Sequence, residues 1–253
     1  MRPSDLDLAP ILPAQKVVVG RILFSKKDQL ILQAECRSRT GLPITRTEAL
    51  AAHLVVCMQR ARKKLHHHHH LGASKIQVDL VYDIRNLVVT AAAATTTGNV
   101  NLPVASFLDF DLLAREDAVA RVSAMLHRDR QKLSITWRDS FRWLEHCRNT
   151  CQPTINTCLG MCLPGNSNVC ISPLHRLGIH STPLFDGALT YRFFLRDGMS
   201  YLADGLVFFT DTRKQNEEEL EVTIDVLADV WAELAASPET IFPSSLSLIR
   251  SRL

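Results

Sequence analysis

The hydrophobic pattern begins with a predicted strand followed by a predicted helix. Val17 to Phe24 is a run of apolar and β-branched residues, which is typical of a strand. Lys26 to Cys36 then places Leu30, Ile31 and Ala34 at helical spacing. The chain therefore opens with a strand and then a helix.

The strongest helix signal runs from Thr45 to Lys64, after a break at Gly41-Leu42-Pro43. It starts with a Thr-x-x-Glu sequence formed by Thr45 and Glu48, the pattern of a capping box, which satisfies free backbone amides at a helix start. One face is apolar and the last turn is basic, which suits the helix dipole. The apolar positions are Leu50, Leu54, Cys57, Ala61 and Leu65.

The remaining pattern mixes strands and helices joined by short connections. Strands are predicted over 76–84, 87–90, 100–106, 168–171, 189–195, 205–209 and 220–224, and helices over 112–133, 137–147 and 225–235. A turn is expected at 95–98 and a loop at 151–165. This order predicts an α/β domain with a mixed β-sheet and flanking helices. We expect a linker-like leader over 1–16, the folded lobe over 17–236 and a tail over 237–253.

Composition places the chain among globular proteins. It has 253 residues, of which 46% are apolar and 22% charged. It carries seven cysteines, and its start at Met1-Arg2-Pro3 has no secretory pattern, so we expect a reducing, cytoplasmic setting. No apolar run approaches the roughly 20 residues that cross a bilayer, so we expect no membrane span.

Charge is unevenly distributed along the chain. The net charge is +3, but residues 1–65 hold 12 Lys/Arg against 5 Asp/Glu, and residues 197–239 hold 2 against 11. The simpler explanation is that helices solvate their outer faces, and the alternative is a basic face that attracts a phosphorylated cofactor. Nucleic-acid binding is not expected, because aromatics are only 6% of the chain and no basic stripe alternates with them.

Several motifs with chemically active residue types favour structural roles. No glycine-rich phosphate loop is present, which argues against nucleotide hydrolysis and hydride transfer. The histidine run 66–70 is expected to be a solvated loop rather than a metal site. His53, within the strong helix, is expected to be structural. A nucleophilic Cys170 paired with His175 or His180 is an alternative that the spacing does not require.

The cysteines of the second half raise a zinc alternative. Two Cys-x-x-x-Cys pairs have spacings seen in structural zinc sites, but only six residues separate the pairs. We therefore expect thiols and no metal. The cysteines concerned are Cys147, Cys151, Cys158, Cys162 and Cys170.

The order of these segments resembles the C-terminal half of the BAHD acyltransferases, the plant and fungal family that moves acyl groups from coenzyme A onto alcohols and amines. Thr45 to His53 resembles that family's thr-x-x-glu-ala-leu-x-ala-his helix. Asp83-Ile84-Arg85 and Gly98-Asn99 follow in the family's order, and Glu219 to Ile224 and Trp231 to Leu234 resemble its last strand and helix. The resemblance implies one lobe of a two-lobed fold like that of chloramphenicol acetyltransferase.

The resemblance also shows what is missing. The family's His-x-x-x-Asp motif, whose histidine removes a proton from the acceptor, does not occur, so no catalytic residue is assigned. The family's asp-phe-gly-trp-gly is replaced by Pro183 to Gly187, and only the final glycine, Gly187, stays in register. In the family the first aspartate pairs with the arginine that corresponds to Arg85, so Asp186 is the expected substitute partner. Gly98 and Asn99 are expected to be structural.

The resemblance places Ser172 in the family's thr-ser-trp region, beside the acyl-transfer channel, with Pro173 instead of the tryptophan. It implies acyl-CoA as a co-substrate, no permanently bound cofactor, and a small-molecule acceptor. An N-terminal acyltransferase lobe, or self-association, would complete the site. The hypothesis is an acyltransferase half domain that is inactive alone, and the alternative is a non-catalytic binding or interaction protein that retains the lobe's fold.

Overall fold

The computed structural model describes residues 16–65, 75–84, 101–149, 167–175, 204–212 and 219–236. Several predicted segments lie outside these ranges. They are the strands at 87–90 and 189–195, the turn at 95–98, the loop at 151–165 and the histidine run at 66–70.

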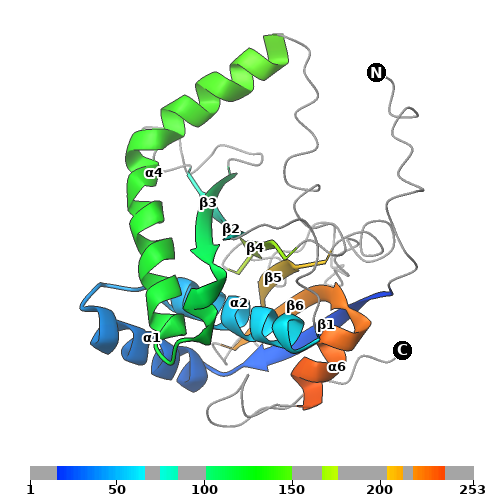
Figure 1. Ribbon diagram of the computed structural model, residues 1–253. Helices are drawn as coiled ribbons and strands as arrows, with labels where there is room; N and C mark the ends of the chain where they lie inside the picture. The colour runs from blue at the N-terminus through cyan, green and yellow to red at the C-terminus, as the bar shows by residue number, and fades with distance from the viewer. Residues whose placement is uncertain are drawn as a thin grey trace, which may run out of the picture.

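The described strands form one mixed sheet in the order β1-β6-β5-β4-β2-β3 (Figure 1). The strands are β1 (Val17–Phe24), β2 (Lys75–Asp83), β3 (Asn101–Asp109), β4 (Val169–Pro173), β5 (Leu206–Asp211) and β6 (Leu220–Leu227). β2, β4 and β5 pair in parallel, whereas β1 with β6, β5 with β6 and β2 with β3 pair antiparallel. The predicted mixed sheet is confirmed.

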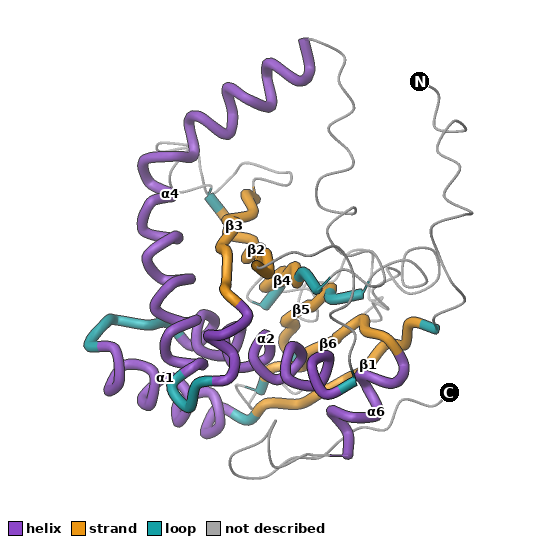
Figure 2. The backbone as a smooth tube through the Cα atoms, viewed as in Figure 1, coloured by secondary structure: helices purple, strands orange, loops and turns teal. Residues whose placement is uncertain are grey.

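The described helices pack on one face of this sheet (Figures 1 and 2). They are α1 (Lys26–Thr40), α2 (Arg46–Lys64), the 3-10 helix η3 (Phe110–Ala114), α4 (Ala118–Asn149) and α6 (Ala228–Ala236). Ile76, Val78 and Leu80 of β2 are buried against the helical layer. Because successive strand residues point to opposite faces, Gln77 and Asp79 belong to the other face.

α2 is the central helix of the layer. The predicted capping box is present, since Thr45 Oγ1 accepts from the Glu48 amide while the Glu48 carboxylate accepts from the Thr45 amide at 2.8 Å. Every residue from Glu48 to Gln59 is buried, so the helix packs on all sides rather than along one stripe. Arg62, in the basic last turn, is also buried.

α1 forms where the sequence predicted it, but its apolar triplet faces solvent. Ser25 and Asp28 form a capping box at its start. Gly41, at φ 68°, ends it in the left-handed conformation that glycine adopts without strain. The buried positions are Asp28, Gln29, Leu32 and Cys36, whereas Leu30 is 44% and Ile31 37% exposed.

Three predictions about helix boundaries are wrong. Residues 112–114 belong to η3, and Arg115 has extended backbone (φ −75°, ψ 148°), so α4 begins only at Ala118. The predicted helices 112–133 and 137–147 then form one helix to Asn149, because no proline or glycine interrupts residues 133–137. β6 continues to Leu227, since Asp225 to Leu227 pair with Val19 to Val17, so the closing helix starts at Ala228 and not at 225.

Candidate functional site

Ser172 lies on the sheet face opposite the helices. Its neighbour Ile171 is fully buried in the main core, so the alternation of a strand directs Ser172 to the other side. Ser172 pairs in register with Phe208, and Phe208 pairs with Thr223. The serine is half-buried between apolar and hydroxyl side chains of this face.

Two buried carboxyl groups share the same face in the next lateral row. Asp79 pairs with Cys170, Cys170 with Leu206, and Leu206 with Asp225, so the four residues follow one line across four strands. Asp79 is 2% and Asp225 6% exposed. The row therefore has one carboxyl group at each end and two apolar residues between them.

Burial alters the acidity of both groups. Desolvation raises the pKa of Asp79, although the Gln77 amide, which donates to both its oxygens at 3.2 and 3.0 Å, lowers it in part. Desolvation raises the pKa of Asp225 to about 6. Burial therefore keeps a proton on Asp225 up to a higher pH than on an exposed aspartate.

The structure separates the cysteine and histidine considered as a nucleophilic pair. Cys170 is buried on the Asp79 face and packs against Val81 and Leu206. His175 Nε2 lies 3.4 Å from Thr47 Oγ1, at the start of α2 in the helical layer. His180 lies outside the described residues. The pair Cys170 and His175 does not form a catalytic dyad.

No cluster of potential metal ligands occurs within the described ranges. Cys151, Cys158 and Cys162, which the zinc alternative required, lie outside those ranges. The side chain of Cys147 is not among those described.

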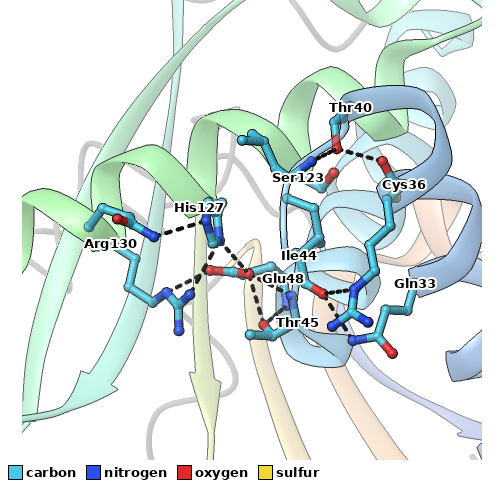
Figure 3. Close-up of polar contacts among 12 residues, drawn as sticks. Gln33, Cys36, Thr40, Ile44, Thr45, Glu48, Ser123, His127 and Arg130 are labelled. Atoms are coloured by element: carbon cyan, nitrogen blue, oxygen red, sulfur yellow. Dashed lines mark hydrogen bonds and ion pairs between the residues drawn. The ribbon is translucent and has the colours of Figure 1, made fainter.

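A buried polar cluster joins α2 to α4 (Figure 3). The Glu48 carboxylate accepts from Thr45 Oγ1 at 2.9 Å, and its other oxygen lies 2.8 Å from Arg130 Nε. His127 Nδ1 lies 3.2 Å from Glu48 Oε2, and His127 Nε2 lies 3.0 Å from the Gln131 amide nitrogen. Arg130 Nη2 also lies 3.2 Å from His127 Nδ1, so the imidazole ring contacts both members of the Glu48–Arg130 ion pair.

The described histidines thus belong to the helical layer rather than to the Ser172 face. His127 joins two helices, and His53 Nε2 lies 3.8 Å from Cys57 Sγ within α2. The ring of His53 packs edge-on against Phe24, with centroids 6.5 Å apart. His53 also borders a pocket of about 160 Å³ between α1, α2 and the start of α4. The structural role expected for His53 agrees with these contacts.

Basic residues near the C-terminal end of α2 contact other elements of the chain. Arg60 donates to the carbonyls of Leu113 and Arg115 at 3.0 and 2.9 Å. Lys64 Nζ lies 2.6 Å from Glu233 of α6, and Arg62 forms a buried ion pair with Asp204. These three cations contact other parts of the fold. Their contacts weaken the hypothesis that this basic segment binds the phosphates of a cofactor.

Of the site residues expected from the sequence, the structure describes only Ser172. Arg85, Gly98, Asn99, Asp186 and Gly187 lie outside the described residues, so their expected structural roles and the pair of Arg85 with Asp186 stay predictions.

Sequence reasoning missed both buried aspartates and the Glu48 cluster. A signal existed for the aspartates, because Asp79 and Asp225 each stand between apolar residues of a strand. The contact of His127 and Arg130 with Glu48 joins residues about 80 positions apart, and no local pattern gives that distance.

No protein-family model and no curated protein sequence matches this chain. Solved structures do. Vinorine synthase matches with a TM-score of 0.58 and 16% identity over 88% of this chain and 47% of its own. TRI101 of F. graminearum, complexed with coenzyme A and deoxynivalenol, matches with a TM-score of 0.61 and 13% identity over 90% of this chain and 49% of its own. TRI101 of F. sporotrichioides, complexed with coenzyme A and T-2, matches with a TM-score of 0.61 and 14% identity. That match covers 90% of this chain and 51% of the TRI101 chain.

These similarities establish the fold. Vinorine synthase and TRI101 are BAHD acyltransferases, and the chain spans about half the length of each. The chain therefore has the fold of one half of such an enzyme, a lobe with a mixed sheet and flanking helices, as the motif resemblance implies. Across the described residues, no helix is long and apolar enough to cross a membrane.

Proposed function

We propose that this chain is one lobe of a two-lobed acyltransferase, which moves an acyl group from acyl-CoA onto an alcohol or amine. The observation that carries this proposal is the fold match, which covers 88–90% of the chain and about half of each neighbour. The TRI101 structures contain coenzyme A with a small-molecule ligand, which supports acyl-CoA as co-substrate and a small-molecule acceptor here. No permanently bound cofactor is needed for this chemistry.

In the proposed reaction, the acceptor's oxygen or nitrogen attacks the thioester carbonyl. The carbon–sulfur bond breaks, coenzyme A leaves as the thiol, and the acceptor's proton passes to a general base. We assign Ser172 to the wall of this site, on the sheet face that the described helices leave free. Its hydroxyl there would position the donor or the acceptor rather than react.

The general base would come from a second, N-terminal-type lobe. The chain lacks the His-x-x-x-Asp motif, and His53, His127 and His175 contact elements of the helical layer. We therefore expect the chain alone to bind acyl-CoA weakly and to transfer no acyl group.

The missing His-x-x-x-Asp motif also favours a second candidate, a non-catalytic binding protein that retains the lobe's fold. Within the described residues, His53, His127 and His175 contact helices. Three cations near the end of α2 contact other parts of the chain. On this hypothesis Ser172 has no role in binding acyl-CoA. Binding measurements separate the two candidates.

The test measures donor binding and turnover separately. Acetyl-CoA is titrated into the purified chain by calorimetry, and free coenzyme A is then quantified chromatographically in the presence of an alcohol or an amine. Chromatography is preferable to a thiol reagent, because the chain itself carries seven cysteines. Ser172→Ala is compared with Ser38→Ala, which removes an exposed hydroxyl from α1 on the helical side of the sheet.

The outcomes are distinct. Binding without turnover, weakened by Ser172→Ala but not by Ser38→Ala, supports the lobe. Turnover by the chain alone contradicts the assignment of the base to another lobe. Absence of both binding and turnover favours the non-catalytic protein.

A further inference from the structure

The outer face of α1 carries an apolar centre with basic residues at both ends. Leu30, Ile31 and Ala34 are exposed, with Leu30 at 44% and Ile31 at 37%. Lys27 lies one turn before them and Arg37 one turn after, and both are exposed. Arg37 Nε donates to the Ile44 carbonyl at 2.8 Å, while its side chain keeps its charge at the surface. At 3.6 residues per turn, these five positions lie on one side of the helix, opposite the buried Leu32 and Cys36.

This side is the outer surface of the described layer. α1 packs on α2 and α4 through its other side, and it is the outermost helix at the lower left of Figure 1. Glu35 is the one acidic residue of α1 that borders the face, and it pairs with Arg39 at 3.3 Å, while the helix's other acid, Asp28, is buried in the cap. The face therefore keeps a positive charge around its apolar centre.

We propose that this α1 face binds anionic lipid surfaces, with Leu30 and Ile31 entering the headgroup boundary and Lys27 and Arg37 contacting lipid phosphates. Charge complementarity favours such a surface, because basic side chains next to apolar ones are the composition of helices that lie in the membrane interface.

The α1 face is too small for a stable interface with a protein partner. A stable protein interface buries about 1,200–2,000 Å². A face of about three helical turns offers a small part of that area. A lipid surface gathers several weak contacts at once, since each Lys or Arg near an anionic membrane adds roughly a fivefold gain in binding. The chain would therefore be a peripheral, salt-sensitive membrane binder.

The test is sedimentation of the purified chain with vesicles. Phosphatidylcholine vesicles containing about one third phosphatidylserine are compared with pure phosphatidylcholine vesicles, at low and at high salt. We expect binding only to the anionic vesicles, and loss of that binding at high salt.

Substitutions test whether α1 is the element that contacts the vesicles. Leu30→Ser with Ile31→Ser should weaken binding at least about tenfold. The matched control Ile135→Ser, at a 77% exposed apolar position of α4, should leave binding unchanged. Lys27→Gln should weaken binding about fivefold, while Lys63→Gln on α2 should have no effect.

Circular dichroism of each variant verifies folding, and these positions are exposed, so the fold is expected to persist. The proposal is overturned if the chain does not bind anionic vesicles, or if the control variants lose binding as much as the α1 variants. It is also overturned if the α1 variants abolish only a concentration-dependent self-association, which would make the face an interface between copies.

Discussion

Arg62 of α2 and Asp204, just before β5, form an ion pair of 2.7 Å between side chains that are 1% and 2% exposed. Arg62 also donates from Nη1 to the carbonyl of Ser167, just before β4, at 3.0 Å. One guanidinium thus fixes the starts of two central strands to the middle helix. Gly205, at φ 101°, follows the aspartate and completes the turn into β5.

We predict that Arg62→Met destabilises the fold by about 3–5 kcal/mol, because Asp204 is left as an unpaired buried charge. The free energy of unfolding in urea measures this change. The double variant Arg62→Met with Asp204→Leu should recover part of the loss, since it removes both charges. Lys63→Met, at the exposed neighbouring position, is the control and should change stability by less than about 0.5 kcal/mol. A double variant as unstable as the single one would contradict this account.

Glu48→Gln should destabilise the fold by about 3 kcal/mol, because a neutral amide cannot cap α2 and neutralise Arg130 at the same time. Thermal unfolding of the purified variant tests this. Glu35→Gln removes an exposed i,i+4 pair with Arg39 and is expected to cost less than about 0.5 kcal/mol. Equal losses in the two variants would show that the cluster of Glu48, His127 and Arg130 is not an important tether.

Local signals in the sequence were enough for much of the fold. The capping box at Thr45 and the β-branched runs of β1 and β2 each predict an element within a few residues. Tertiary pairing decided the rest. Asp225 looked helical next to Ala228, yet the pairing of β6 with β1 extends the strand through it.

The arrangement of the candidate site also depends on tertiary pairing that local sequence signals do not give. Ser172 was found through a motif, but the row that joins Asp79, Cys170 and Asp225 depends on strand register across four strands. Register follows from which face is buried, and a short strand such as β4 carries too few residues to fix it locally. Likewise, the exposure of Leu30 follows from the position of α1 outside α2 and α4, although its spacing is that of a buried stripe.

Gly20→Ala should be strongly destabilising, because a Cβ at this position of β1 would overlap the six-membered ring of Trp231 on α6. We expect a loss of about 1–3 kcal/mol from overpacking, measured by urea unfolding with tryptophan fluorescence as the signal. Gly41→Ala is the matched comparison, since space around Gly41 is open and only its φ of 68° opposes a side chain. That variant should lose about 1 kcal/mol. A Gly20 variant that loses no more than the Gly41 variant would mean that α6 moves freely away from β1.

Asp225 should make the stability of the fold depend on pH. Its pKa is raised from 3.8 to about 6 in the folded chain, because burial disfavours the carboxylate, so the folded state binds more protons than the unfolded state between these values. Stability should therefore fall as the pH rises from about 4 to about 6 and change little through this group above that range. Asp225→Asn removes the penalty and should be more stable than the parent by about 2–3 kcal/mol at pH 8, with little difference at pH 4. Urea unfolding at a series of pH values measures both chains, and Asp211→Asn, at a less buried position of β5, serves as the control. A parent whose stability rises across this range in step with the Asp225 variant would show that the carboxyl is not held in its protonated form by the sheet.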